Sequence, residues 1–272
     1  MSDNRAIGVF DSGLGGLTVM KELTALLPAE SIVYFGDTGR VPYGTKSVDT
    51  IKKYALQDEK FLLSKNVKLI VAACGTVSSV AGRDGEMLPV PFIEVVSHSV
   101  KAAVSATKNK KIGVLATAAT IKSGAHKKQI LKLLPDAEVY EAAGSLLVPL
   151  VEEGWTDENN TVTTEALKRY LEPLKQKGID TLILGCTHFP VLKKAISNIL
   201  GENVSLINMG SAAARAVKER LAVSNMLCSE DNKPFYEFFV SDKPNNFVTA
   251  ASILLGKETD EESVTLTTVD GL

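Results

Sequence analysis

Two cysteines of the chain stand in nearly the same local context and could act together as acid–base groups. Each ends an apolar run and is followed within two positions by a threonine: Cys74 with Thr76, and Cys186 with Thr187. A thiolate is a base as well as a nucleophile, and helix N-termini or cationic groups favour its formation. Two thiols across a cleft suit a reaction in which one takes a proton from a tetrahedral carbon and the other returns one to the opposite face. The product of such a reaction is the mirror image of its substrate.

The residues beside the two thiols extend this chemistry. The threonines, with the N–H groups around them, could hold a carboxylate, and a nearby carboxylate or imidazole could tune each thiol. His188 directly follows Thr187 and is the one histidine for which we expect a function, whereas His98 and His126 are expected at the surface. Cys228 lacks the repeated context, and a lone buried cysteine is usually inert.

Apolar strands alternate with amphipathic helices along the chain. Strands are predicted over 6–10, 32–35, 67–73, 92–96, 112–116, 137–142, 180–185, 204–207 and 234–240, with a short one within 263–268. Helices are predicted over 17–27, 47–66, 100–106, 121–135, 163–177, 192–200, 212–222 and 247–255, with a short one from 77. Strands that are apolar on both faces indicate parallel sheets covered by helices on each side. The predicted fold class is therefore α/β.

Polar residues follow five of these strands. They are Asp11 with Ser12, Asp37, Cys74 with Gly75 and Thr76, Thr117, and Cys186 with Thr187 and His188. In open α/β sheets, ligands bind beyond the carboxyl ends of the strands, so five such ends predict a cleft. Asp11 and Ser12 taken alone would equally suit a helix N-cap.

The repeated cysteine strand suggests two related halves that face each other across this cleft. We expect one domain from residues 1–97 plus 208–272 and a second from residues 98–207, which places one of the two cysteines in each.

Composition excludes several classes of protein. The 272 residues carry a net charge of −2, so no basic footprint argues for nucleic acid, and no apolar run approaches the roughly 20 residues that span a bilayer. The start lacks the pattern of a signal peptide.

Three cysteines fit reduced thiols in a cytoplasmic protein. Dispersed histidines give no metal spacing, and the glycines at 13–16 match neither nucleotide-binding motif. We therefore expect no metal and no cofactor.

The chain resembles the glutamate racemases, cofactor-independent enzymes that interconvert L- and D-glutamate for peptidoglycan synthesis. The resemblance runs from residue 7 to about 210 and is carried by four segments: 7–19, 36–44, 149–152 and 182–190. It implies two pseudo-symmetric α/β domains with mainly parallel sheets, an active site in the cleft between them, and a last segment that returns to the first domain. It also implies a small-molecule substrate, with a homodimer, which relatives often form, left open.

The resemblance assigns roles to individual residues. Cys74 and Cys186 would be the catalytic thiols, Asp11 would assist Cys74, His188 would assist Cys186, and Glu152 would lie near the second thiol. Asp11 and His188 are counted among the substrate contacts as well, together with Ser12, Asp37, Tyr43, Gly44, Gly75, Thr76, Thr117 and Thr187. Gly75 is a departure, because the family usually has an asparagine there whose side chain contacts the substrate.

Three other readings stay open. A racemase with the same fold could act on aspartate or a related amino acid. A non-catalytic relative could bind an amino acid without turnover, with Gly75 as a mark of a decayed site. A thiol hydrolase would need only one activated cysteine and a histidine, and would leave the second cysteine unexplained.

Overall fold

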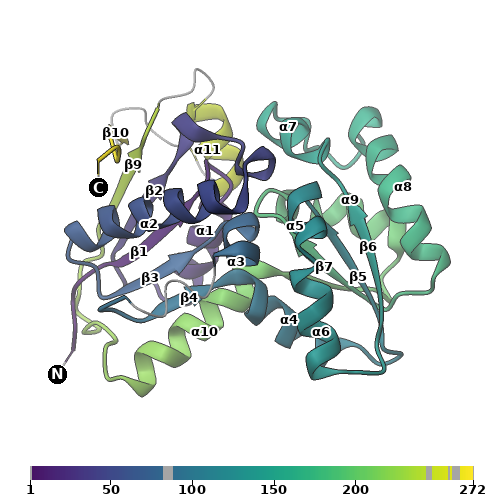
Figure 1. Ribbon diagram of the computed structural model, residues 1–272, viewed down its shortest axis with the longest axis horizontal. Coiled ribbons are helices and arrows are strands. Elements are labelled where there is room, and N and C mark those ends of the chain that lie inside the picture. The colour runs from purple at the N-terminus through teal and green to yellow at the C-terminus, as the bar shows by residue number, and fades with distance from the viewer. Residues whose placement is uncertain (1, 82–87, 243–246, 257, 259–263, 272) are drawn as a thin grey trace.

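The strands of the chain form two parallel sheets that lie side by side (Figure 1). The computed structural model describes residues 2–81, 88–242, 247–256, 258 and 264–271. The first sheet has the order β10-β9-β2-β1-β3-β4, formed by β1 (Ile7–Asp11), β2 (Ile32–Gly36), β3 (Leu69–Ala72), β4 (Phe92–Glu94), β9 (Tyr236–Val240) and β10 (Val264–Leu266). The second has the order β6-β5-β7-β8, formed by β5 (Lys111–Ala116), β6 (Glu138–Ala143), β7 (Thr181–Gly185) and β8 (Ser205–Asn208). All neighbouring strands run parallel, which confirms the predicted fold class.

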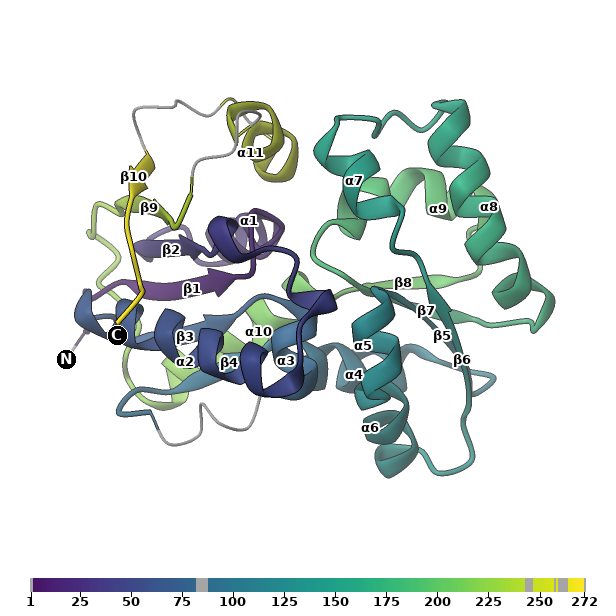
Figure 2. The same ribbon diagram turned by 45° about the horizontal axis from the view of Figure 1, so that its top comes forward.

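Helices cover both faces of each sheet (Figure 2). The first sheet carries α1 (Leu17–Leu26), α10 (Met209–Val223) and α11 (Phe247–Leu255) on one face, and α2 (Val48–Ser64) and α3 (Gly75–Val80) on the other. The second sheet carries α4 (Val95–Ala106) and α6 (Ala125–Leu133) on one face, and α8 (Thr161–Gln176) and α9 (Lys193–Leu200) on the other. Short helices α5 (Ala118–Ser123) and α7 (Leu147–Glu152) follow β5 and β6. Single 3₁₀ turns occur at η1 (Thr38–Arg40), η2 (Tyr43–Thr45) and η4 (Phe189–Leu192).

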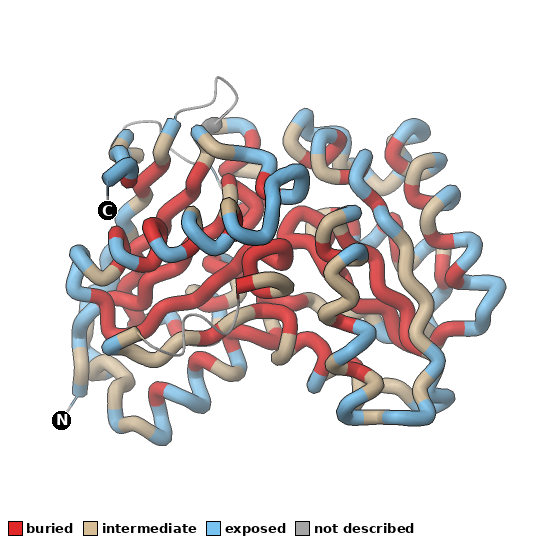
Figure 3. Tube along the Cα trace, in the orientation of Figure 1, coloured by how far each residue is buried: buried red, intermediate tan, exposed pale blue. Residues whose placement is uncertain are grey.

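Successive side chains of β1 enter different parts of the core. Val9 packs in the cluster that contains Leu17 of α1, whereas Phe10 packs in the cluster that contains Ile51 of α2. Because side chains alternate across a strand, a sheet that helices cover on both faces needs apolar residues at nearly every position. Every residue of β1 is buried, and the central strands of the two sheets form the red interior of Figure 3, whereas the edge strands β6, β8 and β10 are intermediate or exposed.

The junction after β4 differs from the prediction. The sequence predicted a strand over 92–96, but β4 ends at Glu94 and α4 begins at Val95. The Glu94 carboxylate accepts hydrogen bonds from the backbone N–H groups of Val96 at 2.6 Å and Ser97 at 2.8 Å. These bonds satisfy N–H groups that a helix start leaves without partners. The cap therefore outweighs the strand preference of the two valines.

The predicted helix over 121–135 is two helices. Gly124 separates α5 from α6 with a φ of 64°, a left-handed conformation that glycine adopts without steric cost. The other predicted elements agree with the structure to within a few residues. One shift matters for the site, because α3 begins at Gly75, directly after Cys74, rather than at Val77.

Apart from Asn208, the last residue of β8, each sheet draws its strands from one side of the predicted domain boundaries. The division into 1–97 plus 208–272 and 98–207 nevertheless stays a prediction, because one apolar cluster runs through both sheets and α4 packs directly on α10. Within the part of the chain that the structure describes, no helix is both long enough and apolar enough to cross a membrane.

Candidate active site

A cavity of about 480 Å³ lies between the carboxyl ends of the two sheets. It receives the loops that follow β1 and β3 from the first sheet and β5 and β7 from the second. All but one of the site residues expected from the sequence line it: Asp11, Ser12, Tyr43, Gly44, Cys74, Gly75, Thr76, Thr117, Glu152, Cys186, Thr187 and His188. Strand register explains the convergence, since Asp11 pairs with Gly36 and Ala72 with Phe10, so neighbouring strands end at the same level.

The thiol of Cys74 is buried at the end of the first cysteine strand. Its Sγ lies 3.3 Å from the hydroxyl oxygen of Ser12, within hydrogen-bond distance for sulfur. Burial and the negative charge of Asp11 raise the pKa of Cys74 to about 12, although the Ser12 hydroxyl acts in the opposite direction. Cys74 therefore holds its proton at neutral pH when the cavity contains no substrate.

The Asp11 side chain is a buried carboxyl group whose two oxygens have different surroundings. Its Oδ2 accepts a hydrogen bond from the backbone N–H of Gly13 at 3.0 Å, while Oδ1 has no partner among the described residues. Burial raises the pKa of Asp11, and the nearby His188 acts to lower it. An unpaired buried oxygen is costly in a folded protein, so an oxygen that lines a cavity is a candidate ligand contact.

The second thiol belongs to a chain of three polar groups. The Sγ of Cys186 lies 3.7 Å from Nδ1 of His188, and Nε2 of the same ring lies 3.0 Å from a carboxylate oxygen of Glu152. Burial by itself lowers the pKa of His188, but the hydrogen bonds to Cys186 and Glu152 outweigh it and raise the pKa to about 10. His188 is thus an imidazolium at neutral pH, held between a thiol and a carboxylate.

Three threonine hydroxyls meet where the two sheets face each other. Thr76 at the start of α3 lies 3.4 Å from Thr117 and 3.5 Å from Thr120, measured between hydroxyl oxygens. Thr117 caps α5 and its hydroxyl donates to that of Thr120 at 3.0 Å. Thr120 also lines the cavity, although it was not among the site residues predicted from the sequence. Its spacing of three from a capping threonine was the signal that could have found it.

A glycine in the loop after β1 allows this loop to contact the segment that contains Thr187 and His188. A β-carbon on Gly15 would lie 2.6 Å from Cε1 of His188, so a side chain there would displace the imidazole. Two residues into α1, the hydroxyl of Thr18 donates to the backbone oxygen of Thr187 at 2.7 Å. Gly15, which belongs to a glycine-rich segment that matches no nucleotide motif, thus allows the loop after β1 to pack against Thr187 and His188.

Asp37 does not line the cavity, contrary to its predicted contact with substrate. Its carboxylate is completely buried and binds the side chains of Arg40, Tyr43 and Ser241. Tyr43 lines the cavity, and its hydroxyl donates a hydrogen bond to Asp37. The sequence correctly placed Asp37 at a strand end, but the side chain faces the support of the loop rather than the cavity.

His126 was expected at the surface and is instead buried, with 1% of its side chain exposed. It lies on α6 behind Gly185, with Cε1 3.5 Å from the position of a β-carbon on that glycine. Neither ring nitrogen has a hydrogen-bond partner among the described residues. Burial lowers the pKa of His126 to about 4, so it is neutral at physiological pH. His98 is partly buried and lies outside the cavity lining.

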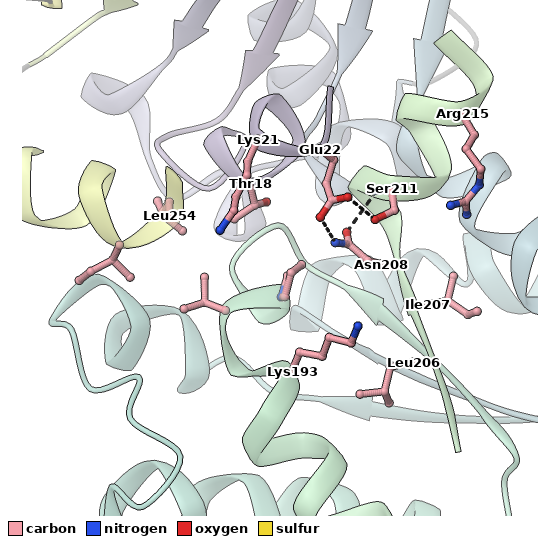
Figure 4. A pocket seen from close by; sticks show the side chains of 13 residues that line it. Thr18, Lys21, Glu22, Lys193, Leu206, Ile207, Asn208, Ser211, Arg215 and Leu254 are labelled. Atoms are coloured by element: carbon pink, nitrogen blue, oxygen red, sulfur yellow. Dashed lines mark hydrogen bonds between the residues drawn. The ribbon is translucent and has the colours of Figure 1, made fainter. Parts of the chain in front are cut away.

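A second cavity, of about 560 Å³, lies against α1, β8, α10 and α11 (Figure 4). It is larger than the cavity with the thiols, but its lining contains no cysteine or histidine. Its one carboxylate, on Glu22, accepts hydrogen bonds from Asn208 at 3.0 Å and Ser211 at 2.5 Å. We therefore assign the chemistry to the smaller cavity. Among the described residues, no group of histidine, cysteine and carboxylate side chains is arranged to hold a metal ion.

Comparison with known proteins agrees with this assignment. A family model described as Asp/Glu/Hydantoin racemase matches residues 7–217. A glutamate racemase of Neisseria meningitidis serogroup A is 46% identical over 94% of this chain and 95% of its own length, and one of Syntrophus aciditrophicus is 44% identical over 92% and 93%. A crystal structure of glutamate racemase from Francisella tularensis in complex with D-glutamate superposes with a TM-score of 0.90 at 39% identity, covering 99% of this chain and 100% of that one.

Proposed function

The chain belongs to the Asp/Glu/Hydantoin racemase family, and we propose that it interconverts L- and D-glutamate with two cysteines and no cofactor. As a racemase of this family it is an isomerase. The observation that carries the proposal is the lining of one cavity by two thiols, each at the end of a strand from a different sheet. One thiol alone would serve a hydrolase; the second is what a two-base reaction requires.

The surroundings of the two thiols suit opposite roles. Cys74 retains its proton in the empty site, so it can act as the acid. The Sγ of Cys186 lies 3.7 Å from Nδ1 of the positively charged His188, which can offset a negative charge on that sulfur during the reaction. The Cys186 thiolate would take the proton from the α-carbon while the Cys74 thiol gives its proton to the opposite face. The thiolate and thiol have then exchanged places, so the reverse reaction uses the same pair in the opposite sense.

The neighbours of each thiol support this exchange. Glu152 binds the far nitrogen of His188 and so favours the charged ring that Cys186 needs. Asp11 opposes ionisation of Cys74 in the empty site. The substrate ammonium group would offset the charge of Asp11 and so ease proton loss from Cys74 when that thiol acts as the base.

The threonines supply uncharged donors for the substrate. Thr76 and Thr187 follow the two thiols, so a carboxylate bound by their hydroxyls would lie next to both reacting groups. The carboxyl and amino groups of an amino acid would in this way fix the α-carbon between Cys74 and Cys186.

The substrate is tested by incubating the purified protein with D-glutamate and following circular dichroism, with D-aspartate in parallel. We expect the signal of D-glutamate to decay to zero and, in heavy water, deuterium to enter the α-position. Turnover of D-aspartate alone would replace glutamate by the shorter substrate. A shift in melting temperature with either amino acid but no turnover would indicate a non-catalytic relative. An acyl intermediate trapped on one cysteine would instead favour a hydrolase.

Supply of D-glutamate for peptidoglycan synthesis is part of the same proposal and rests on the family resemblance. Rescue of a D-glutamate auxotroph by the gene would support it, with a Cys186→Ser gene as the matched control. Location in the cytoplasm and a homodimeric assembly stay predictions, which cell fractionation and light scattering can test.

A further inference from the structure

One wall of the active-site cavity comes from a segment that no sheet holds in place. Tyr43, Gly44 and Thr45 form the short turn η2 and all three line the cavity. Because such a turn has few backbone hydrogen bonds of its own, its position must be fixed by side chains around it. A cluster of side chains fixes it: Asp37, Arg40, Tyr43, Gln57, Asp58 and Ser241.

Arg40 is the centre of the cluster. Its guanidinium donates from Nε to Asp37 at 2.6 Å, from Nη1 to the amide oxygen of Gln57 at 2.5 Å, and from Nη2 to Asp58 at 2.9 Å. The same guanidinium stacks over the ring of Tyr54, 4.1 Å from its centre. Because Tyr54, Gln57 and Asp58 belong to α2, the arginine ties the loop before η2 to this helix. Only 14% of the Arg40 side chain is exposed.

The Tyr43 hydroxyl lies between the two carboxyl groups of the cluster. It is within hydrogen-bond distance of Oδ2 of Asp37 and, at 3.1 Å, of Oδ2 of Asp58. A hydroxyl has one proton to donate, so only one of these contacts can use it. The other contact needs a proton on the carboxyl group. Burial and the charge of Asp37 raise the pKa of Asp58, which is the direction that this second contact needs.

The cluster also reaches the C-terminal part of the chain. The hydroxyl of Ser241, just after β9, donates to Oδ1 of Asp37 at 2.7 Å and accepts from the backbone N–H of Gly39 at 2.9 Å. The Asp37 carboxylate thus receives donors from Arg40, Tyr43 and Ser241, which belong to three separate parts of the loop and its surroundings.

We propose that Arg40 is a positioning residue for the substrate: bonded to Asp37, Gln57 and Asp58, it holds the Tyr43–Gly44 wall where the substrate binds. The inference rests on the proposed racemase function for its substrate. It gives different roles to two aspartates that both bind Arg40 and Tyr43. The charge of Asp37 is required, whereas Asp58 is required only as a hydrogen-bonding group.

Amide substitutions separate these two roles. In Asp58→Asn, the amide supplies an N–H for Tyr43 and an oxygen for Arg40, so we expect KM for D-glutamate within about twofold of the wild-type value. Asp37→Asn leaves Arg40 without its anion, and since hydrogen bonds between charged groups are the strong ones, we expect KM to rise about tenfold or more. Because the thiols are untouched, kcat should change by less than about threefold in both variants.

Arginine variants test the centre of the cluster in the same assay. Arg40→Gln should raise KM about as much as Asp37→Asn does. Arg40→Lys keeps the charge but cannot reach three acceptors, so its KM should lie between those of Arg40→Gln and the wild type. Melting temperatures of the unliganded variants show whether each one folds. If Asp37→Asn and Arg40→Gln fail to fold, Asp58→Asn and Arg40→Lys can still be compared with the wild type.

Binding gives a readout that does not need turnover. The D-glutamate concentration that gives half of the maximal thermal shift should follow the same order as KM. An inactive wild-type protein would contradict the proposed racemase function, and these binding titrations would still test the cluster. Equal KM and half-saturation values in Asp37→Asn and Asp58→Asn, or a loss of kcat at unchanged KM in Arg40→Gln, would overturn the positioning role.

Discussion

A β-carbon added to Gly75 would lie 2.9 Å from the backbone oxygen of Gly185. Gly75 directly follows one thiol and Gly185 directly precedes the other, so the backbones beside Cys74 and Cys186 touch across the two sheets. Real β-carbons essentially never approach another atom this closely, and a backbone oxygen cannot rotate away as the end of a side chain can. The lack of a side chain at Gly75 therefore allows the two thiol-bearing segments to lie this close together.

Replacing Gly75 with alanine should lower kcat/KM for D-glutamate about tenfold or more. The added methyl group must push the two segments apart, and displacement of reacting groups by about 1 Å can cost on the order of 100-fold in rate. Steady-state kinetics and a thermal melt of the variant measure the effect on catalysis and on folding separately. Wild-type kinetics in Gly75→Ala would show that the segments adjust without changing the spacing of the thiols.

Each active-site thiol should be indispensable, whereas the third cysteine should not be. A serine hydroxyl is a far weaker acid than a thiol, so Cys74→Ser and Cys186→Ser should each lower kcat by at least about 10³. Cys228→Ser is the matched control, because Cys228 is absent from the cavity lining and its Sγ donates to the backbone oxygen of Ala29. Racemisation at the full rate in either of the first two variants would contradict the two-thiol mechanism.

The imidazolium of His188 should make the protein lose stability as the pH rises. Its pKa is raised from 6.5 to about 10 in the folded protein, so folding retains a proton that the unfolded chain releases. The stabilisation is complete below pH 6.5 and is lost as the pH rises towards 10, by up to roughly 1.4 kcal/mol for each pH unit. Between pH 6.5 and 9, the melting temperature should fall with rising pH for the wild type and stay nearly constant for His188→Asn. Parallel curves for the two proteins would contradict the assignment.

The buried His126 should act in the opposite direction. Its pKa is lowered to about 4, so the unfolded chain binds a proton that the folded protein refuses, and stability is lost as the pH falls from 6.5 towards 4. Replacing His126 with leucine also removes two buried nitrogens that have no hydrogen-bond partner in the described part of the chain, and each such nitrogen costs roughly 1–3 kcal/mol of stability. Urea unfolding should therefore show His126→Leu as stable as the wild type or more so at pH 7, with a larger advantage at pH 5. An advantage that shrinks at pH 5 would contradict this account.

The alternation of apolar strands with amphipathic helices was enough to predict both parallel sheets and most element positions. Local pattern failed where a short-range polar contact decided the outcome. Val95 and Val96 favour a strand by type, but the Glu94 carboxylate caps a helix at that point. The predicted helix at 121–135 is broken because Gly124 takes a left-handed conformation, which the surrounding apolar pattern does not show.

The sequence by itself determined the chemistry of the site: two thiols in matching contexts, a histidine beside one of them, and hydroxyls at the ends of parallel strands. This is local information, since strand direction and residue type decide what reaches the carboxyl edge of a sheet. Tertiary structure alone decided which of these groups face the cavity and how each is charged. Asp37 turns to Arg40 instead of the cavity. Burial and the charge of Asp11 raise the pKa of Cys74, whereas hydrogen bonds to Cys186 and Glu152 raise that of His188 against the effect of burial. Those outcomes depend on side chains distant in the sequence, such as Glu152 and Ser241, whose distances to the site exist only after the chain has folded.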